Sequence, residues 1–240
     1  MKLNDRLSEI AGKIPKCNIL ADIGTDHGYI PIYALENGLC KKALAADLRE
    51  GPLKMAYANI EKSDVEKSIE LRLGNGLEPI SLSECDVVVI AGMGGNLIKD
   101  ILADSLEKAK AANLLLLQPN NAVDSLRRWL NENGFEITDE SLALDAGKLY
   151  NVLSAKWTGK TEKYDQFSYY IGKKLLERKQ PLLERYLNKK LKELDVIIEG
   201  RSKACKQRNY SEEYPNSMET SEYIEIRDKL EAYLKGEISE

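Results

Sequence analysis

A glycine-rich turn follows the first predicted strand of the chain. Residues 21–29 read ADIGTDHGY, so Asp22, Gly24 and Gly28 are spaced as Asp-x-Gly-x-x-x-Gly. Glycines directly after a strand permit a tight turn and let the backbone approach a ligand closely at the carboxyl edge of a parallel sheet. We therefore expect Asp22, Gly24 and Gly28 to contribute to a cofactor-binding site.

Two further polar positions follow the next two predicted strands. Asp47 ends the second strand, and an acidic side chain about twenty residues beyond a glycine turn can accept both hydroxyls of an adenosine ribose. Asp47 could instead only cap the helix that follows. Asn75 and Gly76 come after the third strand, where an Asn side chain can read the edge of an adenine. Matching positions at three successive strand ends predict an adenosine-containing cofactor.

The spacing of the glycines distinguishes between two such cofactors. The dinucleotide fingerprint Gly-x-Gly-x-x-Gly is missing, which disfavours a nicotinamide-dependent dehydrogenase. The turn instead resembles the first motif of class I methyltransferases. Their cofactor, S-adenosylmethionine, carries an amino acid in place of the pyrophosphate.

The fourth predicted strand ends in a second glycine-rich stretch, AGMGG at residues 91–95. Many amino-methylating enzymes carry Asn or Asp followed by Pro-Pro-Tyr at this point, and this chain does not. Gly92 and its neighbours could let a flat base lie close to the cofactor, or could serve only as the entry to a helix. We include Gly92 among the predicted cofactor-binding residues.

Strands and helices alternate through the first two-thirds of the sequence. This alternation predicts a parallel, doubly wound sheet. The last two strands have no helix between them, so they should pair as a hairpin and place an antiparallel strand in a seven-stranded sheet. Predicted strands are 18–23, 42–47, 69–73, 86–91, 113–118, 135–142 and 148–157, and predicted helices are 29–36, 52–61, 96–103 and 122–133.

The pattern changes to long helical periodicity after Trp157. The apolar residues Leu176, Leu183, Leu187, Leu191, Leu194 and Ile198 fit one helical stripe. A second helix should start near Thr220 and carry Ile224, Leu230 and Leu234, with residues 200–218 as the connection. We expect an α/β, Rossmann-like domain over 1–159 and a coiled-coil-like helical hairpin over 160–240.

Charge is distributed unevenly along the chain. The net charge is −4, yet residues 173–208 hold twelve basic side chains against five acidic ones. Such a local excess of positive charge attracts a polyanion. The same residues could instead only form the solvated face of a helix. We expect the tail to bind RNA through Lys173, Lys174, Arg178, Arg185, Lys189 and Lys190.

Composition excludes several other classes of protein. The four cysteines form no Cys-x-x-Cys pair and there is one histidine, so we expect neither a disulfide framework nor a metal site. No apolar run approaches the roughly 18 residues of a membrane span, and the N-terminus does not resemble a signal peptide. The expected location is the cytoplasm, with no membrane partner.

Three segments together carry a resemblance to a known family. ADIGTDHGYIP at 21–31, AGMGG at 91–95 and LQPN at 117–120, followed by a basic helical tail, resemble the bacterial tRNA (adenine-22, nitrogen-1) methyltransferases. The resemblance runs from Leu3 to about Lys156 and is weaker in the tail. It implies a Rossmann-like domain, S-adenosylmethionine as methyl donor, and methylation of an adenine in the D arm of tRNA.

Four residues are candidates for the catalytic step. The ring nitrogen of adenine already carries a lone pair, so positioning is the main requirement, and the base must be exposed or flipped and stacked. Asp26 could stabilise the cationic product or take a proton. His27 could contact the cofactor or base or only brace its loop, Tyr29 could stack or only pack, and Asn120 could bind a base edge or only form a turn.

Other functions stay open from the residues alone. The chain could methylate another RNA or a small molecule, which a panel of acceptors would test. It could also be a non-catalytic module that binds a protein through its helical hairpin. An Asp47→Ala variant distinguishes a binding module from an enzyme, because a binding module should keep its partner whereas an enzyme should lose activity.

Overall fold

The computed structural model describes residues 2–205 and 218–237 of the 240-residue chain. By its internal contacts the chain divides into two compact units, Met1–Glu162 and Lys163–Glu240. Lys206 and Arg208, which belong to the basic stretch noted in the sequence, lie outside the described residues, as does most of the expected connection between the two tail helices.

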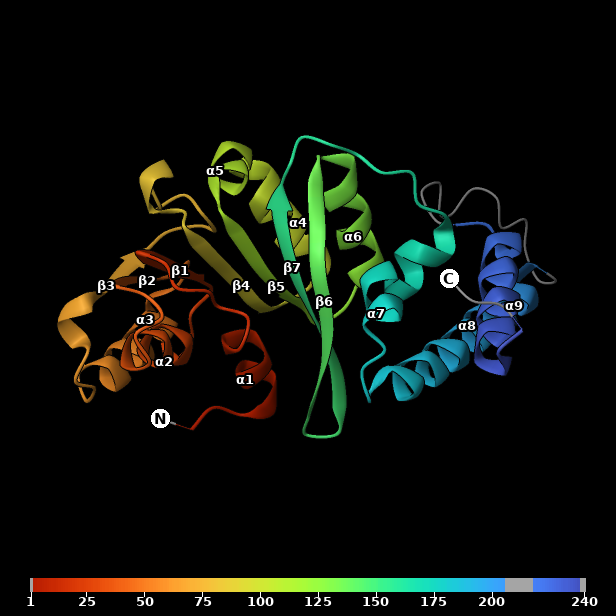
Figure 1. Cartoon of the computed structure of the whole chain (residues 1–240), viewed down its shortest axis with the longest axis horizontal. Helices are drawn as coiled ribbons and strands as arrows, with labels where there is room; N and C mark the ends of the chain where they lie inside the picture. The colour runs from red at the N-terminus through yellow and green to blue at the C-terminus, as the bar shows by residue number, and fades with distance from the viewer. Residues whose placement is uncertain (1, 206–217, 238–240) are drawn as a thin grey trace. The chain divides into compact units, whose positions relative to one another are not determined.

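The first unit is built on a seven-stranded sheet (Figure 1). The strand order is β3-β2-β1-β4-β5-β7-β6, and β7 runs in the direction opposite to the other six strands. This confirms the predicted Rossmann-like seven-stranded sheet with its closing hairpin. The strands are β1 Ile19–Ile23, β2 Lys42–Asp47, β3 Ile69–Leu73, β4 Val87–Met93, β5 Leu114–Pro119, β6 Phe135–Asp145 and β7 Lys148–Trp157.

Helices connect the strands of this unit. The predicted helices are confirmed within one or two residues at their ends, whereas the short α5 was not predicted. The helices are α1 Asp5–Ala11, α2 Tyr29–Glu36, α3 Glu50–Ile60, α4 Gly95–Asp104, α5 Leu106–Ala111 and α6 Val123–Glu132, with single 3-10 turns at η1 Glu66–Ser68 and η2 Leu82–Glu84.

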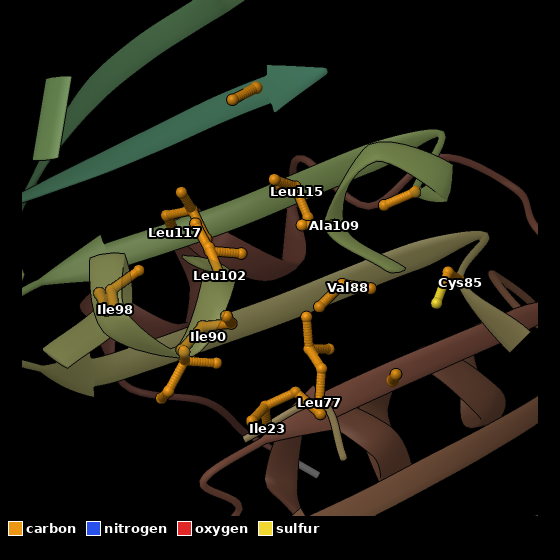
Figure 2. Close-up of a cluster of buried hydrophobic side chains, with 14 of the residues drawn as sticks. Ile23, Leu77, Cys85, Val88, Ile90, Ile98, Leu102, Ala109, Leu115 and Leu117 are labelled. Atoms are coloured by element: carbon orange, nitrogen blue, oxygen red, sulfur yellow. The ribbon is translucent and has the colours of Figure 1, made fainter. Parts of the chain in front are cut away.

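Both faces of the sheet are covered because successive side chains of each strand point to opposite sides. In β4, Val88 and Ile90 pack with α4, α5 and α6, as Figure 2 shows for part of this cluster. Val87 and Val89 join the cluster on the other face, which includes residues of α1 and α2. The continuous apolar run of β4 therefore positions the strand end that follows it.

The second unit is helical, and here one sequence prediction is wrong. It contains the π-helical turn η3 Ser168–Gly172, then α7 Lys173–Arg178, α8 Leu183–Cys205 and α9 Thr220–Lys235. The predicted single stripe is broken, because Leu176 lies on α7 and the rest of the stripe on α8. Lys179 adopts a left-handed conformation with φ 48° and ends α7, and Pro181 cannot continue a helix.

The two long tail helices pack on each other. Leu194 of α8 is buried, as are Ile226 and Leu230 of α9. Ile224, which the sequence placed on this apolar side, is instead exposed. Residues 200–205, predicted as part of the connection, belong to α8.

Within the described ranges, no helix has the length and apolar character needed to cross a membrane. The same residues contain no group of three or more His, Cys, Asp or Glu side chains arranged to hold a metal ion.

Candidate active site

A cavity of about 530 Å³ lies at the carboxyl ends of β1, β2 and β4. This is the edge at which doubly wound sheets bind ligands, and the volume is in the range of small-molecule sites. Its wall is formed by Asn4, Arg6, Leu7, Asp22, Gly24, Thr25, Asp26, His27, Gly28, Tyr29, Ile30, Asp47, Arg49, Ala91, Gly92 and Met93.

The glycine turn after β1 forms one wall as predicted from its spacing. Gly24 has φ 78° and Gly28 has φ 68°, which glycine adopts without strain. The amides of Gly24 and Thr25 both donate to the carbonyl of Ala46, at 2.8 and 3.0 Å. A Cβ on Gly24 would lie 1.9 Å from the Met93 side chain, so the turn is held against both β2 and β4.

Asp47 lies in the wall next to this turn. Its Oδ1 accepts a hydrogen bond of 2.8 Å from the backbone N–H of Arg49. Arg49 is itself the N-cap residue of α3, whose helical amides receive no side-chain cap. The bond therefore shapes the loop and does not cap the helix. No described residue donates a hydrogen bond to Oδ2 of Asp47.

Asp22 is the most deeply buried carboxyl group of the cavity wall. Burial raises the pKa of Asp22 to about 6, and the nearby negative charge of Asp47 acts in the same direction. The proximity of the Thr25 hydroxyl acts in the opposite direction, yet Thr25 Oγ1 is buried without a hydrogen bond of normal geometry. The wall thus holds a carboxyl group and a hydroxyl that a polar ligand would satisfy.

Three of the predicted catalytic residues form one cluster in the wall. His27 Nε2 lies 3.2 Å from Asp26 Oδ2, and the His27 ring stacks on the Tyr29 ring with 5.0 Å between centroids and 13° between planes. The Asn59 side chain donates to the carbonyl of His27 at 3.0 Å. The cluster presents a flat aromatic pair beside a carboxylate that is two-thirds exposed.

A hydrogen-bond network at the ends of β4 and β5 completes the cavity. The Gln118 amide, fully buried, accepts from the Gly92 N–H at 3.2 Å and from Arg6 Nη1 at 2.6 Å through Oε1. Its Nε2 donates to Asn120 Oδ1 at 3.1 Å, and Asn120 Nδ2 donates to the Gly92 carbonyl at 2.7 Å. Asn120 does not itself line the cavity; it holds Gly92, which does.

Two predicted cofactor residues lie apart from this cavity. Asn75 is exposed after β3, and its backbone carbonyl accepts from Glu78 N. Gly76 packs closely against Ile101, since a Cβ there would lie 2.8 Å from the Ile101 side chain. The structure therefore brings Asp22, Gly24, Gly28, Asp47 and Gly92 together, and leaves Asn75 and Gly76 outside the wall.

Sequence reasoning did not find the contribution of the N-terminal helix. Asn4, Arg6 and Leu7 line the cavity, and α1 packs against β6 and β7. The apolar spacing of this segment indicates a helix, but nothing in it shows which strands the helix covers. Arg49 and Met93 were also not named as wall residues, although Arg49 lies two residues after Asp47 and Met93 lies within the AGMGG stretch.

The predicted RNA-binding residues lie on α7 and α8. Lys174 pairs with Glu177 at 2.8 Å and Lys189 with Glu193 at 3.6 Å, both at the surface, where such pairs contribute little. Lys190 is mostly buried, pairs with Glu193 at 2.9 Å and lies 4.8 Å from the centre of the Tyr170 ring. Lys173 lies over Tyr164, and Arg178 and Arg185 also make contacts.

Comparison with known proteins identifies the family. Residues 3–153 match the family model described as a methyltransferase domain. The chain is 35% identical over 209 residues to the tRNA (adenine(22)-N(1))-methyltransferase of Bacillus subtilis, covering 85% of this chain and 88% of that protein. The chain belongs to the tRNA (adenine-22, N1) methyltransferase family. This confirms the resemblance carried by the sequence motifs.

Solved structures of this family match the chain over nearly its whole length. A putative tRNA (m1A22) methyltransferase of Streptococcus pneumoniae, in complex with S-adenosyl-L-methionine, has a TM-score of 0.81 at 31% identity and covers 95% of this chain and 99% of its own. The structure of M. capricolum TrmK in complex with S-adenosyl-homocysteine has a TM-score of 0.78 at 27% identity, and the match covers 98% of this chain and 99% of that one.

Proposed function

We propose that this protein transfers a methyl group from S-adenosylmethionine to the N1 atom of adenine-22 in tRNA. Its family membership supports this reaction. The observation that carries it is the cavity at the carboxyl ends of the parallel strands, whose wall combines the glycine turn with Asp22 and Asp47.

The cavity wall fits the cofactor. Gly24 and Gly28 give backbone access, and Asp47 has an oxygen available for ribose hydroxyls. The buried hydroxyl of Thr25 needs a polar partner, and the carboxyl group of Asp22 suits the cationic ammonium of an amino acid. When bound, S-adenosylmethionine supplies a methyl group on a sulfonium.

The remaining wall residues suit the acceptor base. The stacked rings of His27 and Tyr29 offer a flat surface for an exposed adenine. Asn120 and Gln118 fix Gly92, where the absence of a side chain leaves room for a planar ring. Asp26 stabilises the positive charge that N1 methylation places on the base, and its Oδ2 is an acceptor for a proton later lost from the exocyclic amine.

We further propose that residues 1–159 bind the cofactor and perform the reaction, whereas residues 160–240 bind the tRNA backbone. The local excess of basic side chains on α7 and α8 supports this division, because phosphate contacts by Lys and Arg dominate the affinity for nucleic acids. We place the reaction in the cytoplasm, where bacterial tRNA is modified.

The test is transfer of radiolabelled methyl groups from S-adenosylmethionine to unmodified tRNA transcripts, followed by nucleoside analysis. We expect 1-methyladenosine, and its loss when adenine-22 is replaced by another base. Incorporation that persists in the replaced transcript would point to a different nucleotide. No incorporation into tRNA, with measurable cofactor binding, would contradict the proposal and direct the search to other acceptors.

A further inference from the structure

Arg6 of α1 is a fixed positive charge in the cavity wall. Its Nη1 donates a 2.6 Å hydrogen bond to Gln118 Oε1, and its guanidinium carbon lies 5.7 Å from the centre of the Tyr150 ring. Gln118 is fully buried and is itself held by Gly92 and Asn120. A long side chain that is normally mobile is therefore held in one orientation.

Among the described residues, the guanidinium of Arg6 has no anionic partner. No ion pair joins Arg6 to a carboxylate of the described residues, although Asp22, Asp26 and Asp47 line the same cavity. Its two fixed partners, an amide oxygen and an aromatic face, leave most of its five N–H donors available. Such a fork matches the geometry of a carboxylate or phosphate.

The glycine at position 92 leaves one edge of the Arg6 guanidinium uncovered. A Cβ on Gly92 would lie 3.7 Å from Nη1, at van der Waals distance, so a larger residue here would cover that edge. Gly92 lines the cavity as well. The ligand of Arg6 would therefore approach along the same glycine that we assign to the acceptor side.

We propose that Arg6 is an oxyanion-binding residue of this active site. The inference rests on the proposed function, which brings two kinds of oxyanion to the cavity: the carboxylate of the cofactor's amino acid and a phosphate that flanks the target nucleotide. Both offer paired oxygens to the guanidinium. A structural role alone, in which Arg6 only braces Gln118, is the competing explanation.

The experiment compares Arg6→Ala and Arg6→Lys in the full chain with Lys54→Ala, which removes an exposed cation of α3 that pairs with Glu50. Calorimetry measures the affinity of each for S-adenosylhomocysteine and for 5′-methylthioadenosine, which lacks the amino-acid carboxylate. Filter binding measures the affinity for tRNA over a range of salt concentrations, and melting temperature reports folding.

A cofactor contact predicts that Arg6→Ala weakens S-adenosylhomocysteine binding about tenfold or more and leaves 5′-methylthioadenosine binding unchanged. A phosphate contact predicts the reverse pattern: unchanged cofactor affinity, weaker tRNA binding, and a salt dependence shallower by about one phosphate contact. Arg6→Lys should weaken either interaction less than Arg6→Ala does, because lysine keeps the positive charge but cannot donate two parallel hydrogen bonds to paired oxygens.

The inference is overturned if Arg6→Ala binds both cofactor analogues and tRNA like Lys54→Ala, or if it changes only the melting temperature. Failure of the proposed function is a separate result, seen when the unaltered protein methylates no tRNA. The calorimetric comparison does not depend on turnover, so the two failures are distinguishable.

Discussion

The side chain of Asn120 donates a 2.7 Å hydrogen bond to the carbonyl oxygen of Gly92, across 28 residues of sequence. Gly92 has φ 78° and lines the cavity. The backbone of Asn120 also bonds to β4, since its N–H donates to the Met93 carbonyl at 2.7 Å. Asn120, the first residue after β5, therefore sets the backbone conformation of Gly92 and Met93 on the acceptor side of the cavity.

Removal of that bond should slow the reaction and spare cofactor binding. We expect Asn120→Ala to lower kcat by about 10²-fold, because small displacements of a positioned backbone are costly to reaction geometry, while S-adenosylhomocysteine affinity changes little. Asn37→Ala is the matched control, since its side chain makes the same kind of bond to Tyr33 O in an exposed turn. An unchanged kcat in Asn120→Ala would refute the positioning role.

Asp47→Ala should act on the cofactor. Loss of a charged acceptor for ribose hydroxyls should weaken S-adenosylhomocysteine binding by at least about tenfold in calorimetry. Asp64→Ala, which removes a carboxylate from an exposed turn, should bind like the unaltered protein. If both variants bound S-adenosylhomocysteine with equal affinity, the role of Asp47 would be limited to its hydrogen bond with the backbone of Arg49.

The pKa of about 6 for Asp22 predicts a pH dependence of cofactor binding. A cationic ammonium favours the ionised carboxyl group, so affinity should be full above pH 6 and fall by up to about tenfold per pH unit as pH drops below it. The dependence should vanish in Asp22→Asn, which should bind more weakly at pH 8. A flat profile in the unaltered protein would contradict this role.

The raised pKa of Asp22 has the opposite consequence for folding. A buried carboxyl group with a raised pKa stabilises the folded state when it is protonated, and this contribution is lost as pH rises through about 6. At pH 8 without ligand, Asp22→Asn should therefore melt at a higher temperature than the unaltered protein. A lower melting temperature would show that the carboxylate has a stabilising partner.

Two adjacent lysines of α8 should differ in their roles. Lys189 is half exposed, whereas Lys190 is mostly buried near the rings of Tyr170 and Tyr186. Lys189→Ala should weaken tRNA binding and reduce its salt dependence, with the melting temperature unchanged. Lys190→Ala should lower stability by about 1–2 kcal/mol through the lost cation–π contacts. If only Lys190→Ala changed the salt dependence of tRNA binding, Lys190 and not Lys189 would be the residue that contacts phosphate.

A buried ion pair supports the edge of the sheet. Arg127 and Glu140 are joined by bonds of 2.6 and 3.1 Å, and Asn151 donates to Glu140 at 2.9 Å. Glu140→Gln replaces the buried carboxylate that accepts these bonds with a neutral amide, and it should cost about 3–5 kcal/mol. Thermal melting should show this loss. Glu136→Gln, a change on the same strand β6 that breaks an exposed pair with Lys156 of β7, should melt normally.

The strands could be predicted because their chemistry is local. Val87 to Ile90 are apolar in succession, and a strand covered on both faces requires such a run. The break between α7 and α8 was missed because the leucine spacing happens to continue across it, although Pro181 marks the interruption. The unpredicted α5 is a single short helix without apolar periodicity.

The site was predictable only where it follows a strand end. Gly24, Asp47 and Gly92 line one cavity because the parallel strands that precede them end at one edge. Asn75 also follows a parallel strand, yet it is exposed and does not line the cavity. Arg6 could not be found in this way, since its place depends on how α1 packs and on a bond to a residue 112 positions later.

The position of Asn4 in the cavity wall bears on how the protein is handled. Four residues of extended chain span roughly 14 Å at most, so any tag joined ahead of Met1 begins within that length of a cavity residue. Its side chains could enter the cavity and compete with the ligands under study. Binding constants for this protein are therefore best measured after an N-terminal tag has been removed.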